Sequence, residues 1–325
     1  MTTTTALTVT ENGGPEVLQV REVDVPDPGP GQVQVAVAAA GVNFIDVYQR
    51  QGVYPIPTPF TLGLEGAGEV VAVGEGAKAQ VGDRLAWAML PNAMAGLANV
   101  PAAKTVPVPD GLDVPVAAAA MLQGMTAHYL VNSTYAVQPG DVALVHAAAG
   151  GVGQLLVQLI TAKGATVIAT AGSPEKLTIA GRLGAHHLID YARTDDLAAA
   201  IRDASEGQGV HVAYDGVGKA TFDASLASLR PRGMLVLFGG ASGQVPPFDI
   251  QRLNAAGSVF LTRPTLGHYM ATREELLWRG EEILGALAAG SIELEIGGRW
   301  PLAEAAAAYE ALEGRATTGK LLLLP

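Results

Sequence analysis

The N-terminal third of the chain alternates apolar and polar positions over short segments separated by Gly and Pro. Three stretches show this period of two: EVLQVREVDV (16–25), GQVQVAVAAAGV (31–42) and GAGEVVAVG (66–74). In the second stretch Val33, Val35 and Val37 fall on one face, as in a half-buried strand. The pattern predicts a β-rich domain from Leu7 to about Leu112.

From about Pro139 to Pro264 short apolar runs alternate with helical patterns. The apolar runs are DVALVHA (141–147), TVIATA (166–171), HLID (187–190), HVAYDGVG (211–218) and MLVLFGG (234–240). Helical periodicity occurs between them at residues 152–163, 175–183 and 220–229. This alternation predicts an α/β domain built on a doubly wound parallel sheet.

The connecting stretch VAAAAMLQGMTAHYLV (116–131) predicts a helix that breaks at Gly124, in a hinge region. From about Arg273 the tail carries two helical patterns and a last strand, GKLLLLP (319–325), which we expect to fold back on the first domain. We therefore predict a first domain at residues 1–124, a parallel-sheet domain at 125–263, and a return to the first domain at 264–325.

The composition of the chain excludes several classes of function. The 325 residues include no cysteine, which excludes disulfides, thiolate catalysis and cysteine-bound zinc. The net charge of −11 argues against nucleic acid as the main partner, so an anionic ligand needs a local cationic pocket. Apolar runs such as Val114 to Leu122 are too short to span a bilayer, and the start, Met1 to Thr5, has no charged segment before an apolar block. We expect a soluble, cytoplasmic protein.

The stretch HAAAGGVGQ (146–154) follows a predicted strand and opens a predicted helix. Its pattern is Ala147, Gly150 and Gly153 at three-residue spacing, and a second strand completes a βαβ unit of about 30 residues. Small residues let backbone N–H groups and the positive end of a helix approach a pyrophosphate. The pattern favours dinucleotide binding over a glycine-rich turn that serves packing alone.

The end of the second strand indicates which dinucleotide. An NAD site usually carries Asp or Glu there for the ribose 2′-hydroxyl, whereas this chain has Ala171-Gly172-Ser173-Pro174-Glu175-Lys176. Ser173 can donate a hydrogen bond to a 2′-phosphate and Lys176 can bring a cation to it, which favours NADPH. The alternative is that Lys176 is a solvated helix residue, and Glu175 weakens the local positive potential.

Several motifs together resemble the NADPH:quinone oxidoreductases of the zeta-crystallin type, in the zinc-free branch of the medium-chain dehydrogenases/reductases. The similarity runs nearly end to end and lies in NGGPEVLQV, AGVNFIDVYQRQGVYP, GLEGAGEV, VGDRL, QGMTAHYLV, HAAAGGVGQ, AGSPEK, LIDY, YDGVG, LFGGASG, FLTRPTL and GRATTGKLLLLP. The resemblance implies a GroES-like catalytic domain formed by both chain ends, a Rossmann domain between them, and NADPH in a cleft.

The resemblance also implies a set of cofactor-binding residues. Near the nicotinamide it places Asn43, Phe44, Asp46 and Tyr48, with Thr126 and Tyr129 from the connecting helix. On the pyrophosphate it places Ala149, Gly151, Val152 and Gly153, and around the adenosine and 2′-phosphate Gly172, Ser173, Lys176 and Tyr191. Along the nicotinamide side it places Phe238, Gly239, Ala241 and Ser242, with Phe260, Leu261 and Thr262 beyond and Arg315 closing the pocket.

Comparison with the zinc-dependent alcohol dehydrogenases argues against a metal. Asn43 stands at their first ligand position, and their Gly-His-Glu turn reads Gly63-Leu64-Glu65, in which leucine cannot bind zinc. We interpret Glu65 as a polar turn residue that is hydrogen-bonded within its domain. The adjacent His186 and His187 cannot share one helix face and are interpreted as ordinary helix-end residues.

A quinone suits an enzyme without a metal, because it accepts a hydride or electrons readily once it is oriented. Asn43, Tyr48 and Tyr54 are the candidates for proton supply or oxygen stabilisation, with Asp46 holding their loop. Each has a structural alternative, a tyrosine that packs a turn or an asparagine that satisfies backbone groups.

Two other functions stay open. One is NADPH-dependent reduction of enones or enoyl thioesters, and the other is a non-enzymatic NADPH-binding or RNA-associated role, which the acidic charge disfavours. We also expect a homodimer, formed where the strand Met234 to Phe238 and the segment Val259 to Leu261 pair across a two-fold axis. The alternative is an edge covered by the tail.

Overall fold

The computed structural model describes residues 2–314 and 317–325 and contains two compact units. The terminal unit comprises the chain up to Met125 together with Met270 to the C-terminus. The central unit is Thr126–Tyr269. The β-rich and parallel-sheet predictions fall in different units, which are described separately below.

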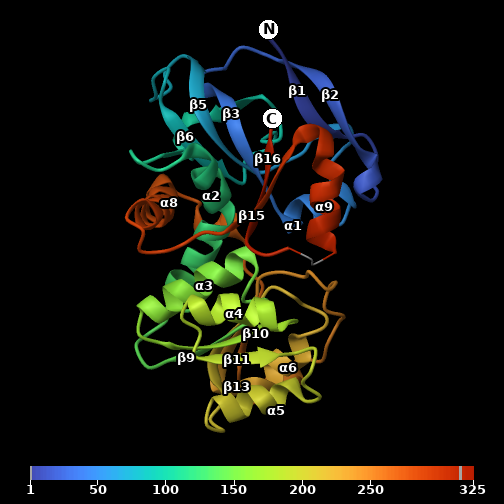
Figure 1. Ribbon diagram of the computed structural model, residues 1–325, viewed down its shortest axis with the longest axis vertical. Coiled ribbons are helices and arrows are strands. Elements are labelled where there is room, and N and C mark those ends of the chain that lie inside the picture. The colour runs from blue at the N-terminus through green and yellow to red at the C-terminus, as the bar shows by residue number, and fades with distance from the viewer. Residues whose placement is uncertain (1, 315–316) are drawn as a thin grey trace. The chain divides into compact units, whose positions relative to one another are not determined.

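The terminal unit is built on two mixed or antiparallel sheets (Figure 1). A three-stranded sheet has the order β2-β1-β4, with bounds Leu18–Val25, Thr2–Val9 and Phe60–Thr61. A seven-stranded sheet has the order β15-β16-β3-β5-β6-β8, with β7 also paired to β3; its bounds are Ile296–Pro301, Lys320–Leu324, Gln32–Val42, Glu65–Val73, Arg84–Ala88, Val106–Pro107 and Leu97–Pro101. The α-helices that lie entirely within this unit are α1 (Phe44–Arg50), α8 (Arg273–Ala288) and α9 (Ala305–Glu313).

Alternation along β3 puts Val33, Val35 and Val37 into the core of the terminal unit, where each is at most 7% exposed. The C-terminal strand joins the same core, because β16 pairs antiparallel with β3 and aligns Leu321 with Val42. The two ends of the chain therefore share one hydrophobic core, and residues of β16 lie next to the segment that leads into α1.

The central unit confirms the predicted parallel sheet. Its six strands have the order β11-β10-β9-β12-β13-β14, with bounds His187–Asp190, Thr166–Ala171, Val142–Val145, Val210–Asp215, Leu229–Leu237 and Phe260–Thr262. The helices are α3 (Gly151–Ala162), α4 (Pro174–Arg182), α5 (Leu197–Ala204), α6 (Phe222–Ser228) and α7 (Gln251–Ala255). Figure 1 shows α3 and α4 on one face of this sheet and α5 and α6 on the other, the doubly wound arrangement.

The predicted break at Gly124 is wrong, because α2 runs without interruption from Val114 to Tyr129 and continues as a π-helical segment, Leu130–Thr134. The glycine serves close packing instead. A Cβ on Gly124 would lie 2.6 Å from Cγ2 of Ile283 in α8, so only glycine lets the two helices approach this closely.

The apolar run that begins at Val114 is also longer than the sequence suggested. Among the described residues, Val114–Thr134 is long and apolar enough to cross a membrane by length and composition. However, 72% of its most apolar window is buried inside the protein, as in a core helix.

Candidate functional site

The turn after β9 has the geometry that close approach to a ligand requires. Ala147 takes a left-handed conformation with φ of 50°, and α3 begins after Gly150, whose position as helix cap carries no capping side chain. A Cβ on Gly153 would lie 2.3 Å from the carbonyl oxygen of Ala147, so a larger residue would push the turn apart. Gln154 ties the turn to the helix by donating to the Ala149 oxygen at 2.9 Å.

Because no side chain caps α3, the first backbone N–H groups of this helix are available to an anion. Gly151 and Val152 form its first turn and are half-buried, whereas Ala149 and Gly153 are buried. The turn therefore offers space and backbone N–H donors to an anion such as the pyrophosphate that the sequence led us to expect.

The strand next to it, β10, leads to the start of α4. Ser173 caps α4 and accepts a hydrogen bond from the backbone N–H of Lys176 at 3.4 Å. Tyr191, 41% exposed, packs over Gly172, where a Cβ would lie 2.6 Å from the tyrosine oxygen. The pKa of Glu175 is lowered, first by a hydrogen bond with the Ser173 side chain, which keeps a negative charge beside the predicted 2′-phosphate position.

The loop after β13 packs against the loop after β12. A Cβ on Gly239 would lie 2.4 Å from the Gly216 oxygen, and the Ala241 N–H donates to the same oxygen at 3.2 Å. Ser242 uses its hydroxyl within the protein, donating to the Val217 oxygen at 2.8 Å and accepting from the Ala220 N–H at 2.9 Å. Phe238 is half-buried and contacts Gly216.

The remaining predicted residues of the central unit lie on α2 and β14. Thr126 is 8% exposed, and Tyr129 is buried with its ring stacked on Tyr269 at 4.3 Å. Phe260, Leu261 and Thr262 form β14, the edge strand of the sheet, and Phe260 is 57% exposed. Arg315 lies outside the described residues.

In the terminal unit, α1 begins with a capping box. The Asp46 N–H donates to the Asn43 backbone oxygen at 3.1 Å, and the Asp46 carboxylate accepts the Asn43 N–H at 2.8 Å. Three aromatic rings gather near this helix, since Tyr48 lies 6.4 Å from Phe44 and 5.4 Å from Tyr54, between centroids. Phe44 and Tyr48 are half-buried and Tyr54 is 40% exposed.

The Asn43 side chain is 3% exposed and is fully engaged inside the protein. Its amide nitrogen donates to Glu65 Oε2 at 2.8 Å and to the Gly41 oxygen at 3.2 Å. Its amide oxygen accepts from Lys320 Nζ at 2.6 Å. This amide is therefore suited to position α1 rather than to contact a substrate.

The interpretation of Glu65 as a turn residue is wrong, although its hydrogen bonding within the domain is confirmed. It is the first residue of β5, has no exposed surface, and pairs with the equally buried Lys320 at 2.5 Å. It also accepts the N–H of Leu122 at 2.5 Å. A Cβ on Gly41 would lie 1.9 Å from Glu65 Oε2, so the glycine leaves the space that the carboxylate fills.

A second buried polar group supports the other side of α1. Asp46 has no exposed surface and accepts the Tyr309 hydroxyl at 2.9 Å. Arg50, also fully buried, pairs with Glu313 at 2.7 Å and lies over the Tyr309 ring. Burial raises the pKa of Asp46 to about 7, against the opposing effects of the Asn43 and Tyr309 hydrogen bonds.

Three residues that hold α1 in place were not predicted from the sequence: Lys320, Tyr309 and Arg50. The available signal was GKLLLLP, in which a lysine opens a strand that is otherwise apolar and thus expected to be buried. Such a lysine needs a buried partner, but the sequence does not say which one.

No group of three or more metal-ligating side chains occurs within residues 2–314 and 317–325. His186 and His187 are not helix-end residues: His187 begins β11, and His186 accepts the Val167 N–H at 3.1 Å through Nδ1. The parallel sheet therefore positions both histidines: His187 belongs to β11, and His186 bonds Val167 of β10.

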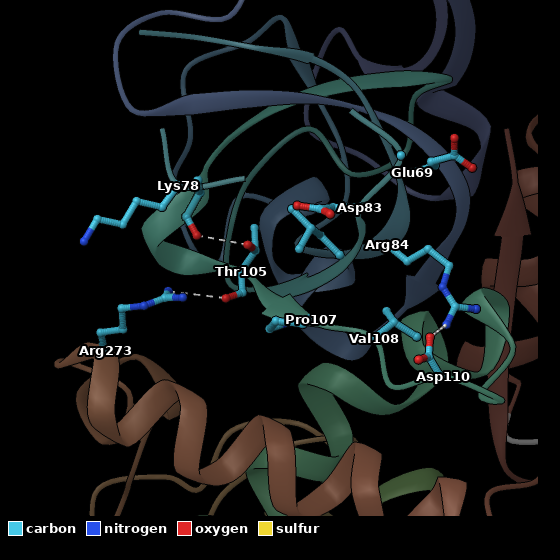
Figure 2. A pocket seen from close by; sticks show the side chains of 12 residues that line it. Glu69, Lys78, Asp83, Arg84, Thr105, Pro107, Val108, Asp110 and Arg273 are labelled. Atoms are coloured by element: carbon cyan, nitrogen blue, oxygen red, sulfur yellow. Dashed lines mark hydrogen bonds and ion pairs between the residues drawn. The ribbon is translucent and has the colours of Figure 1, made fainter. Parts of the chain in front are cut away.

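The terminal unit has a surface cavity of about 450 Å³ that no predicted site residue lines (Figure 2). Arg84 donates to the Pro109 oxygen there and pairs with the exposed Asp110, while Arg273 donates to the Ala103 oxygen at 2.6 Å. Because acids and bases both line it, the cavity has no dominant charge.

The chain matches two known protein families, one over much of each unit. Residues 29–138 match the family described as alcohol dehydrogenase GroES-like domain, and residues 151–276 match zinc-binding dehydrogenase. The quinone oxidoreductase of Pseudomonas aeruginosa is 46% identical over 316 residues, covering 96% of this chain and 97% of the relative. A 2-haloacrylate reductase from a Burkholderia species is 42% identical, covering 98% of each.

A solved structure of Escherichia coli quinone oxidoreductase, complexed with NADPH, matches with a TM-score of 0.96 and 40% identity, covering 99% of this chain and 100% of that one. The predicted GroES-like and Rossmann fold classes are thus confirmed. Full-length similarity at this level, together with the turn after β9, shows that the chain belongs to the quinone oxidoreductase family of the medium-chain dehydrogenases/reductases.

Proposed function

We propose that the protein is an NADPH-dependent quinone oxidoreductase. The proposal rests chiefly on the turn between β9 and α3. No side chain caps the start of α3, and the close packing of the turn admits only glycine at position 153. This turn offers backbone N–H groups to a pyrophosphate. Two further findings support the proposal: the quinone oxidoreductases that are similar over their full length, and the NADPH complex of the Escherichia coli relative.

The central unit would hold the cofactor. Gly151, Val152 and Gly153 would receive the pyrophosphate at the helix start, with Ala149 lining the turn. The 2′-phosphate and adenosine would lie over Gly172, surrounded by Ser173, Lys176 and Tyr191. The nicotinamide side would be lined by Phe238, Gly239, Ala241 and Ser242. The outer part of the nicotinamide site would be formed by Thr126, Tyr129, Phe260, Leu261 and Thr262. When bound, NADPH supplies a hydride.

The terminal unit would orient the acceptor and move a proton. Tyr48 and Tyr54 carry hydroxyls in the aromatic group beside α1 and are the candidates for proton supply to a quinone oxygen, with Phe44 packing beside them. Asn43 and Asp46 act as positioning residues, because their side chains bond within the protein and have almost no exposed surface.

The test measures NADPH oxidation with a small quinone and compares NADPH with NADH. Ser173→Ala and Lys176→Ala should raise KM for NADPH and leave KM for NADH nearly unchanged, because only NADPH has the 2′-phosphate. Thr178→Ala is a matched control, since its hydroxyl donates to the Pro174 oxygen on the exposed side of the same helix. If the protein does not oxidise NADPH with any of the quinones tested, the proposal is refuted.

A second candidate activity is reduction of an activated carbon–carbon double bond. The 2-haloacrylate reductase, similar over 98% of both chains, favours it. The same hydride could be delivered to an alkene that a carbonyl or carboxylate activates. Rates with a quinone, an enone, a 2-haloacrylate and an enoyl thioester, measured side by side, would rank the acceptors.

We further propose a cytoplasmic homodimer that does not bind nucleic acid. The predicted pairing through Met234 to Phe238 is wrong, because β13 already pairs with β12 and β14. The edge strand β14 is paired on one side in this chain, and its Phe260 is 57% exposed, so a second copy could extend the sheet there. Sedimentation of the wild type and of Phe260→Lys tests this, and a monomeric wild type would contradict it.

A further inference from the structure

The central unit contains a chain of four hydrogen-bonded side chains that the proposed function does not use. Thr170 on β10 bonds His146 Nδ1 at 2.8 Å, and His146 Nε2 bonds Ser225 Oγ on α6 at 2.9 Å. The Ser225 hydroxyl in turn donates to Asp215 Oδ2, at the end of β12, at 2.8 Å. All four residues are at most 1% exposed.

The Asp215 carboxylate fixes the direction of the two hydrogen bonds nearest to it, since a carboxylate only accepts. Ser225 must give its proton to Asp215, so the Ser225 oxygen accepts from His146 Nε2–H. Burial lowers the pKa of His146, against the opposing charge of Asp215, which favours the neutral ring. In the neutral ring Nδ1 carries no proton and accepts from the Thr170 hydroxyl.

This order rules out a nucleophilic role for the serine. In a hydrolytic triad the serine gives its proton to the histidine, and the histidine donates to the aspartate. Here Ser225 gives its proton to Asp215 directly, and it has no exposed surface from which to reach a substrate. The four side chains act as a support rather than as a reaction centre.

Two members of this hydrogen-bonded path, His146 and Asp215, support two different loops. His146 opens the turn in which Ala147 has its left-handed conformation and Gly153 packs on the Ala147 oxygen. At the other end, Asp215 Oδ1 accepts the backbone N–H groups of Val217 and Gly218, each at 2.9 Å.

The loop held by Asp215 is the one against which Phe238 and Gly239 pack, through Gly216. The Thr221 hydroxyl adds bonds to both Asp215 oxygens at 2.8 Å, which anchors the carboxylate to the segment before α6. The hydrogen-bonded chain thus connects the loop after β9 to the loop after β12 through one helix.

We propose that His146, Ser225, Asp215 and Thr170 are positioning residues that set the spacing between the pyrophosphate turn and the 215–218 loop. The inference rests on the proposed function, in which the pyrophosphate turn receives the two phosphates and the loop after β13, which packs on the 215–218 loop through Gly216, receives the nicotinamide half of NADPH. It predicts a specific pattern: breaking this hydrogen-bonded path weakens the binding of NADPH and of NADH alike, because both carry the pyrophosphate and the nicotinamide that the supported loops would receive. Adenosine 2′-monophosphate, which lacks the pyrophosphate and the nicotinamide, should bind as before.

The experiment uses two substitutions that each break one link, Ser225→Ala and Thr170→Val. The matched control is Ser228→Ala, because Ser228 is also buried on α6 but donates to the Ser225 carbonyl at 2.9 Å, outside the chain. Affinities for NADPH, NADH and adenosine 2′-monophosphate are measured by calorimetry on folded full-length protein. Ser225→Ala and Thr170→Val should each lower the affinity for both dinucleotides about tenfold, consistent with the loss of a buried hydrogen bond. Each should change the affinity for adenosine 2′-monophosphate less than about twofold.

Three outcomes would overturn the inference: unchanged dinucleotide affinity in both variants, an equal loss in Ser228→Ala, or an equal loss for adenosine 2′-monophosphate. The last two would mean general loosening of the fold. If one chain variant does not fold, the other still breaks the same path. A wild type that binds no dinucleotide would instead refute the proposed function, so the two failures are distinguishable.

Discussion

Replacing Lys320 by methionine removes the ammonium from a buried pair while keeping an unbranched side chain of similar length. In the wild type Lys320 Nζ lies 2.5 Å from Glu65 Oε2 and 2.6 Å from Asn43 Oδ1, and neither charged side chain has any exposed surface. The substitution leaves the Glu65 carboxylate buried without its cation. It also leaves the Asn43 oxygen without a donor.

The expected cost follows from these contacts. Removing one partner of a buried ion pair typically destabilises a protein by about 3–5 kcal/mol, because the remaining charge is uncompensated. Glu65→Gln alone should also destabilise, since it strands the ammonium. The double variant Lys320→Met with Glu65→Gln leaves no unpaired charge, so its cost should be about 1–3 kcal/mol less than the sum of the two single costs.

Urea unfolding followed by tryptophan fluorescence suits this test, because all three tryptophans of the chain, Trp87, Trp278 and Trp300, lie in the terminal unit with Lys320. The control is Lys104→Met, which removes an exposed lysine of the same unit and should change stability by less than about 0.5 kcal/mol. The reasoning is refuted if Lys320→Met costs no more than this control, or if the two single costs simply add.

Three further predictions concern pH, the pyrophosphate turn and catalysis. Asp46, with a folded pKa of about 7 against 3.8, binds a proton in the folded protein that the unfolded chain releases, so it loses stabilising effect as pH rises toward 7. Asp46→Asn should therefore gain stability relative to the wild type by up to about 1.4 kcal/mol per pH unit between pH 4 and 7 and stay level above, measured by urea unfolding; a constant difference would contradict this. Gly153→Ala should abolish NADPH binding in a fluorescence titration, because its Cβ would lie 2.3 Å from the Ala147 oxygen, whereas Gly267→Ala, with open space around its Cβ, should bind normally. Tyr48→Phe should lower kcat for a quinone roughly 10²-fold in steady-state assays without loss of NADPH binding, and unchanged turnover would remove Tyr48 from the mechanism.

Local sequence patterns predicted many of the helices and strands. The strand, turn and helix around HAAAGGVGQ lie where the sequence predicted them, because small residues and apolar periodicity act over a few neighbouring positions. The valines of β3 are buried for the same reason.

Contacts between distant segments could not be predicted in this way. Lys320 meets Asn43 across 277 positions of sequence, because β16 pairs with β3. Gly124 looked like a helix break, since a local pattern does not show that Ile283 packs against it. Likewise, nothing in HAAAGGVGQ indicated that His146 bonds a serine 79 residues away.

The most direct test of the central claim is NADPH binding and oxidation by the purified protein, with and without a metal chelator. We predict saturable NADPH binding and quinone-dependent NADPH oxidation at the same rate in both conditions, because the start of α3 offers backbone N–H groups to a pyrophosphate and Leu64 stands where the zinc-dependent alcohol dehydrogenases have a histidine ligand. A protein that binds neither NADPH nor NADH, or that loses its activity with the chelator, would contradict the account.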